Sequence, residues 1–382
     1  MSRSSFSFSF YLYRTFFMDT LTSAVDATSS ASGTLVAVQP KPLSIAVVGL
    51  GFGRWILKQL VSPELKPFFR LAAVCDLDAA KAAQYAAEYG VPARSLDDLL
   101  ADAEVPVLGL FTGPAGRAGL LRKIIRAGKD VMTTKPFERD ADEGRAVLEE
   151  AISLGRIIHL NSPSPLLPPD VAQIRAWQEV HRLGAPVAAQ VSTWVSYREK
   201  PDGTWLDDPE LCPVAPIFRL GIYALNDIVS LFGPADEVYV MSSRLFTERP
   251  TADHAQLAVR FKSGALVTVM ASFCINDGAH YRNSMTLNFV DGTVYRNVGA
   301  DAKAGSLATL EVVGVREEKS QVLERLQVDG TSGAYQWESF YRAVATRTLT
   351  PADFPERVAT ALRVIEAMAE SAKTGLPVKV RG

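Results

Sequence analysis

Short apolar runs alternate with amphipathic stretches between residues 43 and 161. The runs occupy Leu43–Val48, Leu71–Cys75, Val107–Phe111, Asp130–Thr133 and Ile157–Leu160. The stretches between them carry apolar residues at helical spacing, over residues 54–61, 79–90, 115–127 and 141–154. Strands that are apolar throughout and separated by helices are typical of a parallel sheet covered on both faces. This part of the chain therefore predicts an α/β domain.

The pattern changes after Asn161, where Ser-Pro and Pro-Pro pairs mark a junction. Beyond it, strands are predicted at 187–195, 237–245, 254–261, 266–272, 284–290, 310–315 and 321–328, mostly with a period of two. Helical spacing returns at 171–183, 218–232, 335–346 and 355–373, and a short strand follows Pro377. Asp291-Gly292 is a typical hairpin turn. These segments predict an α+β domain with a large, mostly antiparallel open sheet and helices on one face.

The first 42 residues follow neither pattern. They are rich in Ser and Phe, carry few charges, and lack the continuous apolar stretch of a secretory signal. We predict three regions: a disordered N-terminal extension (1–42), a first domain (43–161) and a second domain (162–382). An organelle transit peptide and a true start at Met18 are alternative interpretations of the extension.

Composition narrows the class of protein. The chain has 382 residues, 48% of them hydrophobic and 21% charged, and a net charge of −2. These values exclude a disordered or collagen-like chain, and the lack of a basic excess predicts no nucleic-acid or membrane partner. No apolar run approaches the roughly 18 residues of a membrane span. The cysteines (Cys75, Cys212 and Cys274) are far apart, which predicts no metal site and a reducing compartment, the cytoplasm.

A glycine-rich turn joins the first predicted strand to the first helix. Gly49 permits a tight turn, and Gly51 lets a pyrophosphate approach the backbone, where free N–H groups of the helix bind its charge. We therefore predict a Rossmann dinucleotide-binding domain. The residues assigned to the cofactor are Gly49, Gly51, Phe52, Gly53 and Arg54. A plain strand–helix turn is the alternative.

Asp76 ends the second predicted strand, roughly 20 residues after the glycine turn, where an acid that binds the cofactor's ribose is expected. Its carboxylate would repel a 2′-phosphate, and its neighbours Leu77 and Asp78 offer no cation, so NAD is favoured over NADP. An exposed turn residue or a helix cap is the alternative interpretation of Asp76.

Polar residues also follow the third and fourth strands, whose carboxyl ends face the ligand crevice of an open parallel sheet. Lys135 can reach cofactor or substrate from there, and Thr112 and Pro114 are assigned to the cofactor. The alternative for Lys135 is a solvated surface charge. Arg117, in the next helix, is predicted to lie on the helix surface.

These motifs together resemble the glucose–fructose oxidoreductase/inositol dehydrogenase (Gfo/Idh/MocA) family. The glycine turn, Asp76 and Lys135-Pro136 occur in the family's order, followed by the segments 219–226 and 371–378. The resemblance covers about residues 43–380. It implies a Rossmann domain, a C-terminal domain whose open sheet makes a homodimer or homotetramer, and oxidation or reduction of sugars and polyols with NAD(P).

The resemblance also implies a catalytic pair. The family's Glu-Lys-Pro maps to Thr134-Lys135-Pro136, which keeps the lysine and lacks the acid. Its histidine position maps to Tyr223, as in the glucose–fructose oxidoreductase branch, and Arg219 replaces the usual acid. A lysine cation close to a tyrosine favours the phenolate, so Tyr223 is predicted as the base and Lys135 as the group that orients the substrate. A core tyrosine is the alternative.

Four residues are assigned to the substrate: Asn161, Trp205, Arg219 and Asn226. Trp205 offers an aromatic plane beside carboxylates, which suits a sugar, although a solvated loop anchored by one Trp explains it equally well. The predicted partner is a small molecule. The predicted function is hydride transfer between a nicotinamide and a sugar, polyol or related compound. The alternative is a non-catalytic NAD(P)-binding sensor or assembly protein on the same fold.

Overall fold

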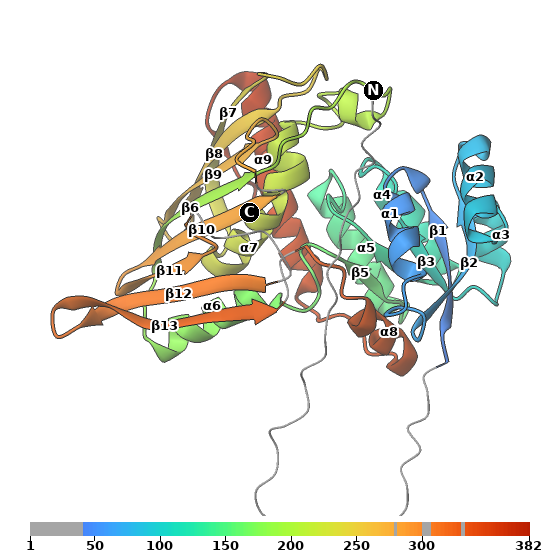
Figure 1. Cartoon of the computed structure of the whole chain (residues 1–382), viewed down its shortest axis with the longest axis horizontal. Coiled ribbons are helices and arrows are strands. Elements are labelled where there is room, and N and C mark those ends of the chain that lie inside the picture. Colours follow the sequence, from blue (N-terminus) through green and yellow to red (C-terminus); the bar gives the residue numbers. More distant parts are fainter. Residues whose placement is uncertain (1–40, 279–280, 300–306, 330–332) are drawn as a thin grey trace, which may run out of the picture. The chain divides into compact units, whose positions relative to one another are not determined.

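A computed structural model of the chain describes residues 41–278, 281–299, 307–329 and 333–382. The predicted N-terminal extension lies outside the described residues except for its last two. Residues 41–382 form one compact unit. Two β-sheets organise it, and each carries its own set of helices (Figure 1). The predicted fold class is therefore confirmed.

The first sheet is parallel and has the strand order β2-β1-β3-β4-β5. Its strands are β1 (Leu43–Val48), β2 (Phe69–Cys75), β3 (Val107–Leu110), β4 (Asp130–Thr133) and β5 (Ile158–Leu160). The helices that connect them are α1 (Leu50–Leu60), α2 (Ala79–Tyr89), α3 (Leu96–Ala101), α4 (Arg117–Arg126) and α5 (Ala141–Ser153). Separate buried clusters cover the two faces, which explains why these strands are apolar throughout.

Two local features differ from the predicted elements. Helix α1 begins at Leu50 rather than Arg54, because the chain turns at Gly49 alone and the next residue is already helical. Helix α3 was not predicted, since six residues are too few to show a period. Helix α2 is capped at both ends: the Asp78 carboxylate accepts the Lys81 N–H at 3.0 Å, and Gly90 ends the helix with φ of 66°.

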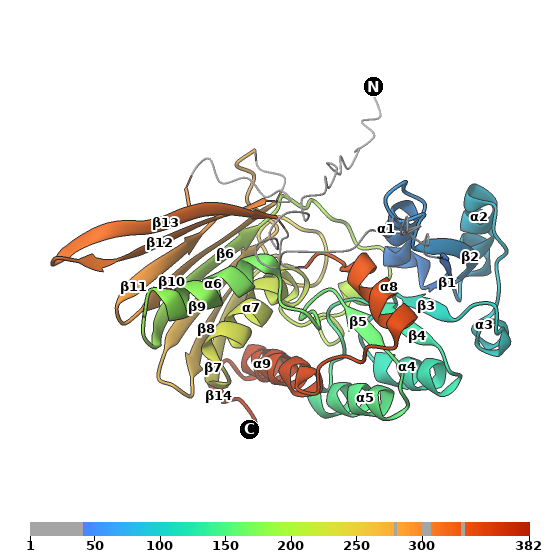
Figure 2. The same cartoon turned by 90° about the horizontal axis from the view of Figure 1, so that it is seen from below.

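The second sheet has nine strands in the order β13-β12-β11-β10-β6-β9-β8-β7-β14 (Figure 2). They are β6 (Pro186–Trp194), β7 (Ala235–Ser243), β8 (His254–Phe261), β9 (Leu266–Ser272), β10 (Arg282–Phe289), β11 (Gly292–Arg296), β12 (Leu307–Arg316), β13 (Lys319–Asp329) and β14 (Val378–Lys379). Only the β6–β9 pair is parallel among these described strands; the others are antiparallel.

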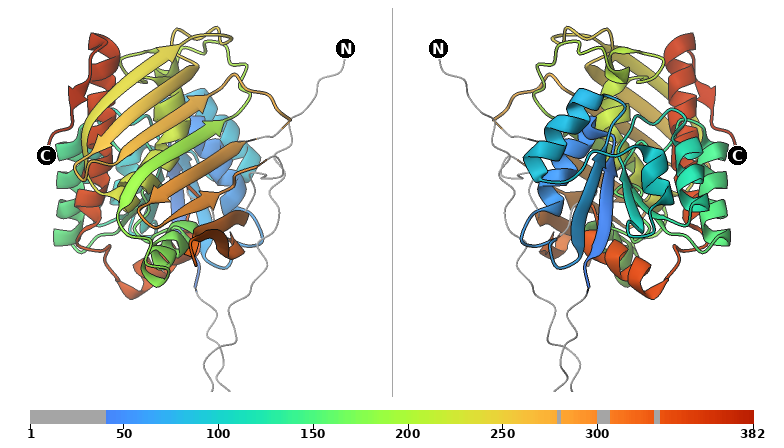
Figure 3. Two further views of the ribbon diagram at one scale, coloured as in Figure 1. Left: turned by 90° about the vertical axis from the view of Figure 1, so that its left-hand side faces the viewer. Right: turned by 90° about the vertical axis from the view of Figure 1, so that its right-hand side faces the viewer.

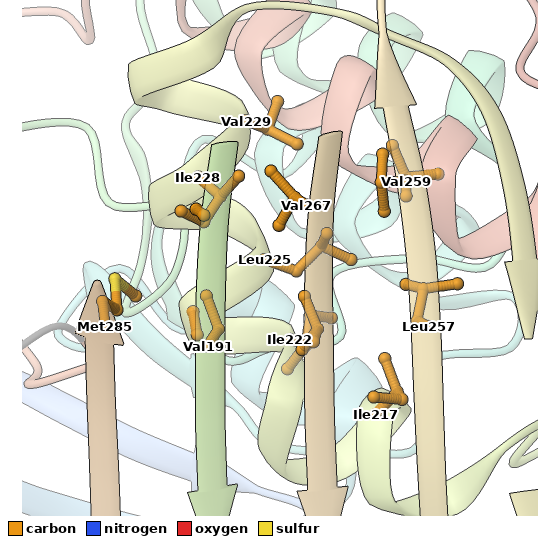
Figure 4. Close-up of a cluster of buried hydrophobic side chains, with 14 of the residues drawn as sticks. Val191, Ile217, Ile222, Leu225, Ile228, Val229, Leu257, Val259, Val267 and Met285 are labelled. Atoms are coloured by element: carbon orange, nitrogen blue, oxygen red, sulfur yellow. The ribbon is translucent and has the colours of Figure 1, made fainter. Parts of the chain in front are cut away.

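One face of this sheet is covered by α6 (Pro169–Val180), α7 (Ile222–Phe232) and α9 (Phe354–Thr374). Leu225 and Ile228 of α7 pack on β-strand residues such as Val191 and Val267 (Figure 4). On the opposite face, no helix formed by the described residues covers the strands (Figure 3), and Val187, Tyr239, Met241 and Leu266 are exposed there. The period of two in the sequence thus separates a covered face from an open one.

A buried arginine fixes α7 against this sheet. Arg296 of β11 is 2% exposed, and its Nη1 lies 2.9 Å from carboxylates of both Asp170 and Asp227. Asp170 belongs to α6 and Asp227 to α7, so one side chain joins a strand to two helices. The position of α7 matters because it carries Tyr223.

Helix α8 (Trp337–Thr346) returns to the first sheet. Its Trp337, Phe340 and Tyr341 pack around Phe69 of β2, with ring centroids 5.5 to 6.1 Å apart. A segment that follows the last long strand of the second sheet thus completes the core of the first. The segment before α8 crosses the edge of the sheet where Lys135 lies.

Candidate active site

The glycine turn forms an open helix start. Gly49 has φ of 86°, and a Cβ atom there would lie 2.9 Å from the Phe111 backbone, so no other residue fits. Gly49 itself provides no side-chain cap, and within α1 the Asp76 carboxylate accepts only the N–H of Leu50, the first residue of the helix. A Cβ atom on Gly51 would meet nothing within 4 Å. Gly53 differs, because its Cβ would meet Val47 at 2.9 Å, which accounts for this glycine by helix–strand packing. The turn therefore presents free N–H groups and room for an anion.

The other two residues assigned to the cofactor in this turn point outward. Phe52 is 45% exposed, with its ring 6.2 Å from that of Phe111. The Arg54 guanidinium lies over the Trp55 ring, 5.4 Å from its centroid.

Asp76 supports the same turn. Its Oδ2 accepts the Leu50 N–H at 2.7 Å and its Oδ1 accepts the Asp78 N–H at 2.9 Å. A cation also lies here, because Lys81 Nζ is 3.7 Å from Asp76 Oδ1. The adjacent residues Leu77 and Asp78 supply no cation, as the sequence indicated, and the cation comes from Lys81. The first turn of α2 brings Lys81 back over the strand end, which local sequence around Asp76 does not show.

The ends of β3 and β4 are joined by Arg117. The predicted surface position of Arg117 is wrong, since the side chain is 1% exposed. Its guanidinium donates to the carbonyls of Thr112, Thr134, Pro136 and Phe137. Pro114, also assigned to the cofactor, is buried beside it and accepts the Arg117 backbone N–H at 3.2 Å.

Lys135 lies just after β4, and its side chain extends toward α7. Its Nζ donates to the Arg219 carbonyl and lies 4.4 Å from the centroid of the Tyr223 ring. The two side chains predicted as a pair thus converge, although they come from different sheets. Burial first, then the charge of Arg219, lowers the pKa of Lys135 to about 7.

Tyr223 is enclosed. Its hydroxyl lies 3.4 Å from the Asn161 Nδ2, which also donates to the Gly333 carbonyl at 2.9 Å. A Cβ on Gly333 would lie 2.5 Å from the Tyr223 ring, so only glycine can cover the ring this closely. Burial, then the neighbouring Tyr335, raises the pKa of Tyr223 well above 10. The expectation that Lys135 favours the phenolate is therefore wrong: the ammonium faces the ring, and desolvation dominates.

Thr134 stands where the resembling family has an acid. Its Oγ1 accepts the Tyr335 hydroxyl at 2.7 Å, and Asn161 Oδ1 accepts the Lys135 backbone N–H at 3.0 Å. Tyr335 comes from the segment before α8. A neutral hydrogen bond across the crevice thus occupies the place of the acid.

Arg219 is paired with an acid that the sequence did not single out. Glu199 receives both Arg219 Nη atoms, at 2.7 and 2.8 Å, and the Nε of Arg249 at 3.0 Å. Burial opposes ionisation of Glu199, but the bonds from Arg219 and the charge of both arginines hold its pKa below the ordinary value. The reversed charge at 219 is therefore compensated within the second domain.

The loop that contains Trp205 is held by the same arginine. Arg249 is 5% exposed and pairs with Asp202 at 3.0 Å and with Asp207. These contacts set Trp205 against the strand end after β3, where a Cβ on Gly113 would lie 3.2 Å from the Trp205 ring. Trp205 therefore packs against the residues that follow β3 rather than lying in solvent, and this half-buried ring also packs edge-on against Phe218.

Asn226 lies one helical turn beyond Tyr223 and donates to the Ser162 Oγ at 2.8 Å. Both Asn161 and Asn226 line a cavity of about 350 Å³ between α6, α7 and α9. Trp205, Arg219, Lys135 and Tyr223 are not in its wall. The structure thus brings Asn161 to the Lys135–Tyr223 pair and places Asn226 on the far side of Asn161.

Several residues of this site gave no signal in the sequence. Glu199 and Arg249 are ordinary charged residues until folding pairs them across 50 positions. Gly333 and Tyr335 precede α8, and only the return of the chain to the first sheet brings them to Tyr223 and Thr134. Among the described residues, no cluster of His, Cys, Asp or Glu could hold a metal ion. No helix in the described ranges has the length and hydropathy needed to cross a membrane.

Two family profiles match the chain. Residues 43–162 match an oxidoreductase family with an NAD-binding Rossmann fold, and residues 171–295 match the GFO/IDH/MocA C-terminal domain. The chain is 27% identical over 315 residues to a D-xylose 1-dehydrogenase (NADP(+)) of Haloferax volcanii, covering 81% of this chain and 91% of that protein.

Solved structures share the fold. An aldose–aldose oxidoreductase from Caulobacter crescentus superposes with a TM-score of 0.68 at 19% identity, over 89% of this chain and 100% of the other. A levoglucosan dehydrogenase in complex with NADH gives 0.67 at 14% identity, over 89% and 100%. At identities of 19% and 14%, these superpositions show a shared fold.

Proposed function

Because the chain belongs to the GFO/IDH/MocA oxidoreductase family, we propose that it is an NAD(P)-dependent oxidoreductase that interconverts a hydroxyl and a carbonyl group of a sugar or polyol. One observation carries this proposal. The Lys135 amine, at the carboxyl edge of the first sheet, lies 4.4 Å from the ring centroid of Tyr223 on α7, a helix that covers the second sheet. Ligands of open parallel sheets bind at that edge. The names of the relatives support a sugar or polyol as the substrate class.

The residues present fit a dinucleotide. Gly49 and Gly51 leave the first turn of α1 open, so its N–H groups can bind a pyrophosphate. Asp76 presents a carboxylate beside this turn, suited to ribose hydroxyls. Thr112 and Pro114 follow β3 on the same edge of the sheet. When bound, the nicotinamide accepts or donates hydride at the substrate carbon.

The preferred cofactor in this proposal is NAD. The Asp76 carboxylate would repel a 2′-phosphate. Lys81 sits 3.7 Å from that carboxylate and partly offsets its charge, and one relative is named for NADP(+). The balance between Asp76 and Lys81 therefore sets the preference.

Lys135 is the proton acceptor in this proposal. A general base works best when its pKa is near the working pH, and burial together with Arg219 brings the pKa of Lys135 to about 7. In its neutral form the amine takes the proton of the substrate hydroxyl. Tyr223 stays protonated and donates a hydrogen bond to the substrate oxygen, with Asn161 beside its hydroxyl. The roles are thus the reverse of those that the sequence predicted.

In this proposal the substrate binds beside the Lys135–Tyr223 pair, at the carboxyl edge of the first sheet, with Trp205 as a neighbour. Trp205 is positioned by Arg249 and offers an aromatic face to a sugar ring. Arg219 contributes through its carbonyl, which holds Lys135, and through its pair with Glu199. Asn161, which follows β5, is the substrate-side residue beside the Tyr223 hydroxyl in this proposal, and Asn226 supports it from behind through its bond to Ser162.

We also propose a second copy of the chain as a partner of the open face of the second sheet. Tyr239, Met241 and Leu266 of that face are exposed, and Met241 and Leu266 are 60% and 59% exposed. Exposed apolar patches of this kind mark interaction surfaces. The three thiols are free, which supports a reducing compartment such as the cytoplasm.

The test is an assay with purified protein, NAD or NADP, and a panel of aldoses, inositols and other polyols. Formation of reduced nicotinamide is followed by absorbance. Turnover that is lost in Lys135→Met supports the proposal. Tight NAD binding without turnover on any member of the panel, in either direction, contradicts it and favours a sensor.

A further inference from the structure

A buried arginine connects the two loops that follow β3 and β4. Arg117 is the first residue of α4, and its guanidinium folds back under the helix start. Its Nη1 donates to the carbonyls of Thr134 at 2.6 Å and Phe137 at 3.1 Å, and also to that of Pro136. Its Nη2 donates to the carbonyl of Thr112. One side chain thus holds the segment on both sides of Lys135 and the loop after the neighbouring strand.

Glu138 completes the connection in the reverse direction. It is 3% exposed, and its Oε2 accepts the Ala118 N–H at 2.7 Å while its Oε1 accepts the Arg139 N–H at 2.7 Å. Glu138 of the loop after β4 thus binds the first turn of α4, and Arg117 of α4 binds the carbonyls of that loop. No ion pair within 4 Å joins Arg117 to an acid among the described residues.

Burying the Arg117 charge costs free energy of folding. A charged group taken out of water loses solvation, and neutral carbonyls return only part of it. Burial accordingly lowers the pKa of Arg117 to about 10, although the charge of Glu138 opposes this shift. A surface arginine on α4 would avoid this cost, as Arg122 does with its exposed partner Glu143. A guanidinium suits this place because its donors point from two nitrogen atoms in a rigid plane and can reach carbonyls of two separate loops, whereas a lysine has its three donors on one nitrogen.

Building on the proposed function, we propose that Arg117 is a positioning residue for Lys135. It fixes the backbone on both sides of Lys135 to the strand end at Thr112, so that the amine is directed at the Arg219 carbonyl and the Tyr223 ring. It touches neither substrate nor cofactor and acts through the lysine. Glu138 fixes the same loop to α4.

The charge of Arg117 supports this role. Burial has the largest effect on the pKa of Lys135 and lowers it. The charges of Arg219 and Arg117 lower this pKa further, and Cys212 raises it. The Tyr223 ring lies against the ammonium. Removing the Arg117 charge is therefore expected to move the titration of Lys135 to higher pH, whereas a lysine at 117 keeps the charge and loses the fork.

The experiment compares Arg117→Met, Arg117→Lys and the matched control Arg122→Met on the same helix. We expect kcat to fall on the order of 10- to 100-fold in both variants at position 117, with the KM for NAD unchanged, and no change in the control. The acid limb of the pH profile moves to higher pH in Arg117→Met and stays in place in Arg117→Lys. This difference separates lost positioning from lost charge.

A second readout does not need turnover. Acylation of the Lys135 amine by a small reagent is followed against pH by mass spectrometry of its peptide. The pH midpoint of acylation is expected to rise in Arg117→Met only. The acylation rate at the high-pH plateau is expected to change more than about twofold in both Arg117→Met and Arg117→Lys. Unchanged kcat, midpoint and plateau relative to Arg122→Met overturn the proposal. If the wild type turns over no sugar, the proposed function fails while the labelling still decides the role of Arg117; if Arg117→Met does not fold, Arg117→Lys decides it.

Discussion

The Lys135 ammonium lies over the face of the Tyr223 ring, 4.4 Å from its centroid, and not at its hydroxyl. The two groups therefore present different chemistry to the crevice. The amine is desolvated and loses its proton more easily, while the phenol is desolvated and keeps its proton. From this relationship we derive a base and a hydrogen-bond donor, and each can be tested separately.

Lys135→Met is expected to lower kcat at least about 100-fold, because it removes the proton acceptor and keeps a side chain of similar length. NAD binding, measured by protein fluorescence, should change little. Lys123→Met, on the exposed side of α4, is the matched control and should behave as wild type. Residual activity within about tenfold of wild type would exclude Lys135 as the base.

Tyr223→Phe is expected to lower kcat on the order of 100-fold through loss of one hydrogen bond to the substrate oxygen. The ring remains under the Lys135 ammonium, so the acid limb of the pH profile should keep its midpoint. Tyr239→Phe, on the open sheet face, serves as the control. If the acid limb disappears in Tyr223→Phe, the tyrosine is the titrating base and the assignment of roles is reversed.

The pH dependence of oxidation should follow Lys135. The amine must be neutral to accept a proton, and its pKa is lowered to about 7. For oxidation, kcat/KM is therefore expected to rise with pH to a plateau, with a midpoint about pH 7, and carbonyl reduction should decline over the same range. Initial rates measured between pH 5 and 10 test this. A midpoint close to the ordinary lysine value of 10.5 would contradict it.

Asp76→Ala is expected to raise the KM for NAD about tenfold or more, since in the proposed cofactor site this carboxylate takes the ribose hydroxyls and it also accepts the Leu50 N–H. The KM for NADP should fall relative to that for NAD, because the repulsion of a 2′-phosphate is removed. Lys81→Met is the companion variant and should worsen NADP use while leaving NAD nearly unchanged. Equal effects of Asp76→Ala on both cofactors would remove Asp76 from cofactor selection.

His159, in β5, should make stability depend on pH. Burial lowers its pKa from 6.5 to about 4, so the unfolded chain binds a proton that the folded chain does not between these values. The free energy of unfolding should therefore decrease as pH falls, by about 2 kcal/mol between pH 7 and 5 from this group. Urea unfolding at both pH values checks it. His159→Leu should reduce the difference, and the half-buried His254→Leu should not.

The strand and helix pattern of the chain followed from local physics. Continuous apolar runs predict strands buried on both faces, and alternation at 254–261 or 266–272 predicts strands buried on one. Gly49 and Gly90 mark positions where only a residue without Cβ adopts positive φ easily. Lys135 and Tyr223 were singled out by motif order, and folding brings them together.

Other features arise only from long-range contacts. From the sequence, Arg117 is predicted as a surface charge, and Arg219 stands where the family has an acid. Only the structure shows that Arg117 binds the Thr134 carbonyl and that Arg219 pairs with Glu199. The pKa directions at Lys135 and Tyr223 also depend on enclosure by Gly333 and by the segment before α8. Burial depends on what lies above a residue, and that cannot be read from its neighbours in sequence.

The spacing of apolar residues and glycine conformation thus predicted most strands and helices of both sheets, whereas the short elements α3 and β11 were missed. The tertiary structure decided which charges are buried, which are paired, and which group of the Lys135–Tyr223 pair holds the proton. Desolvation and pairing act over distances in space, and segments as far apart as Gln59 and Trp337 become neighbours only after folding.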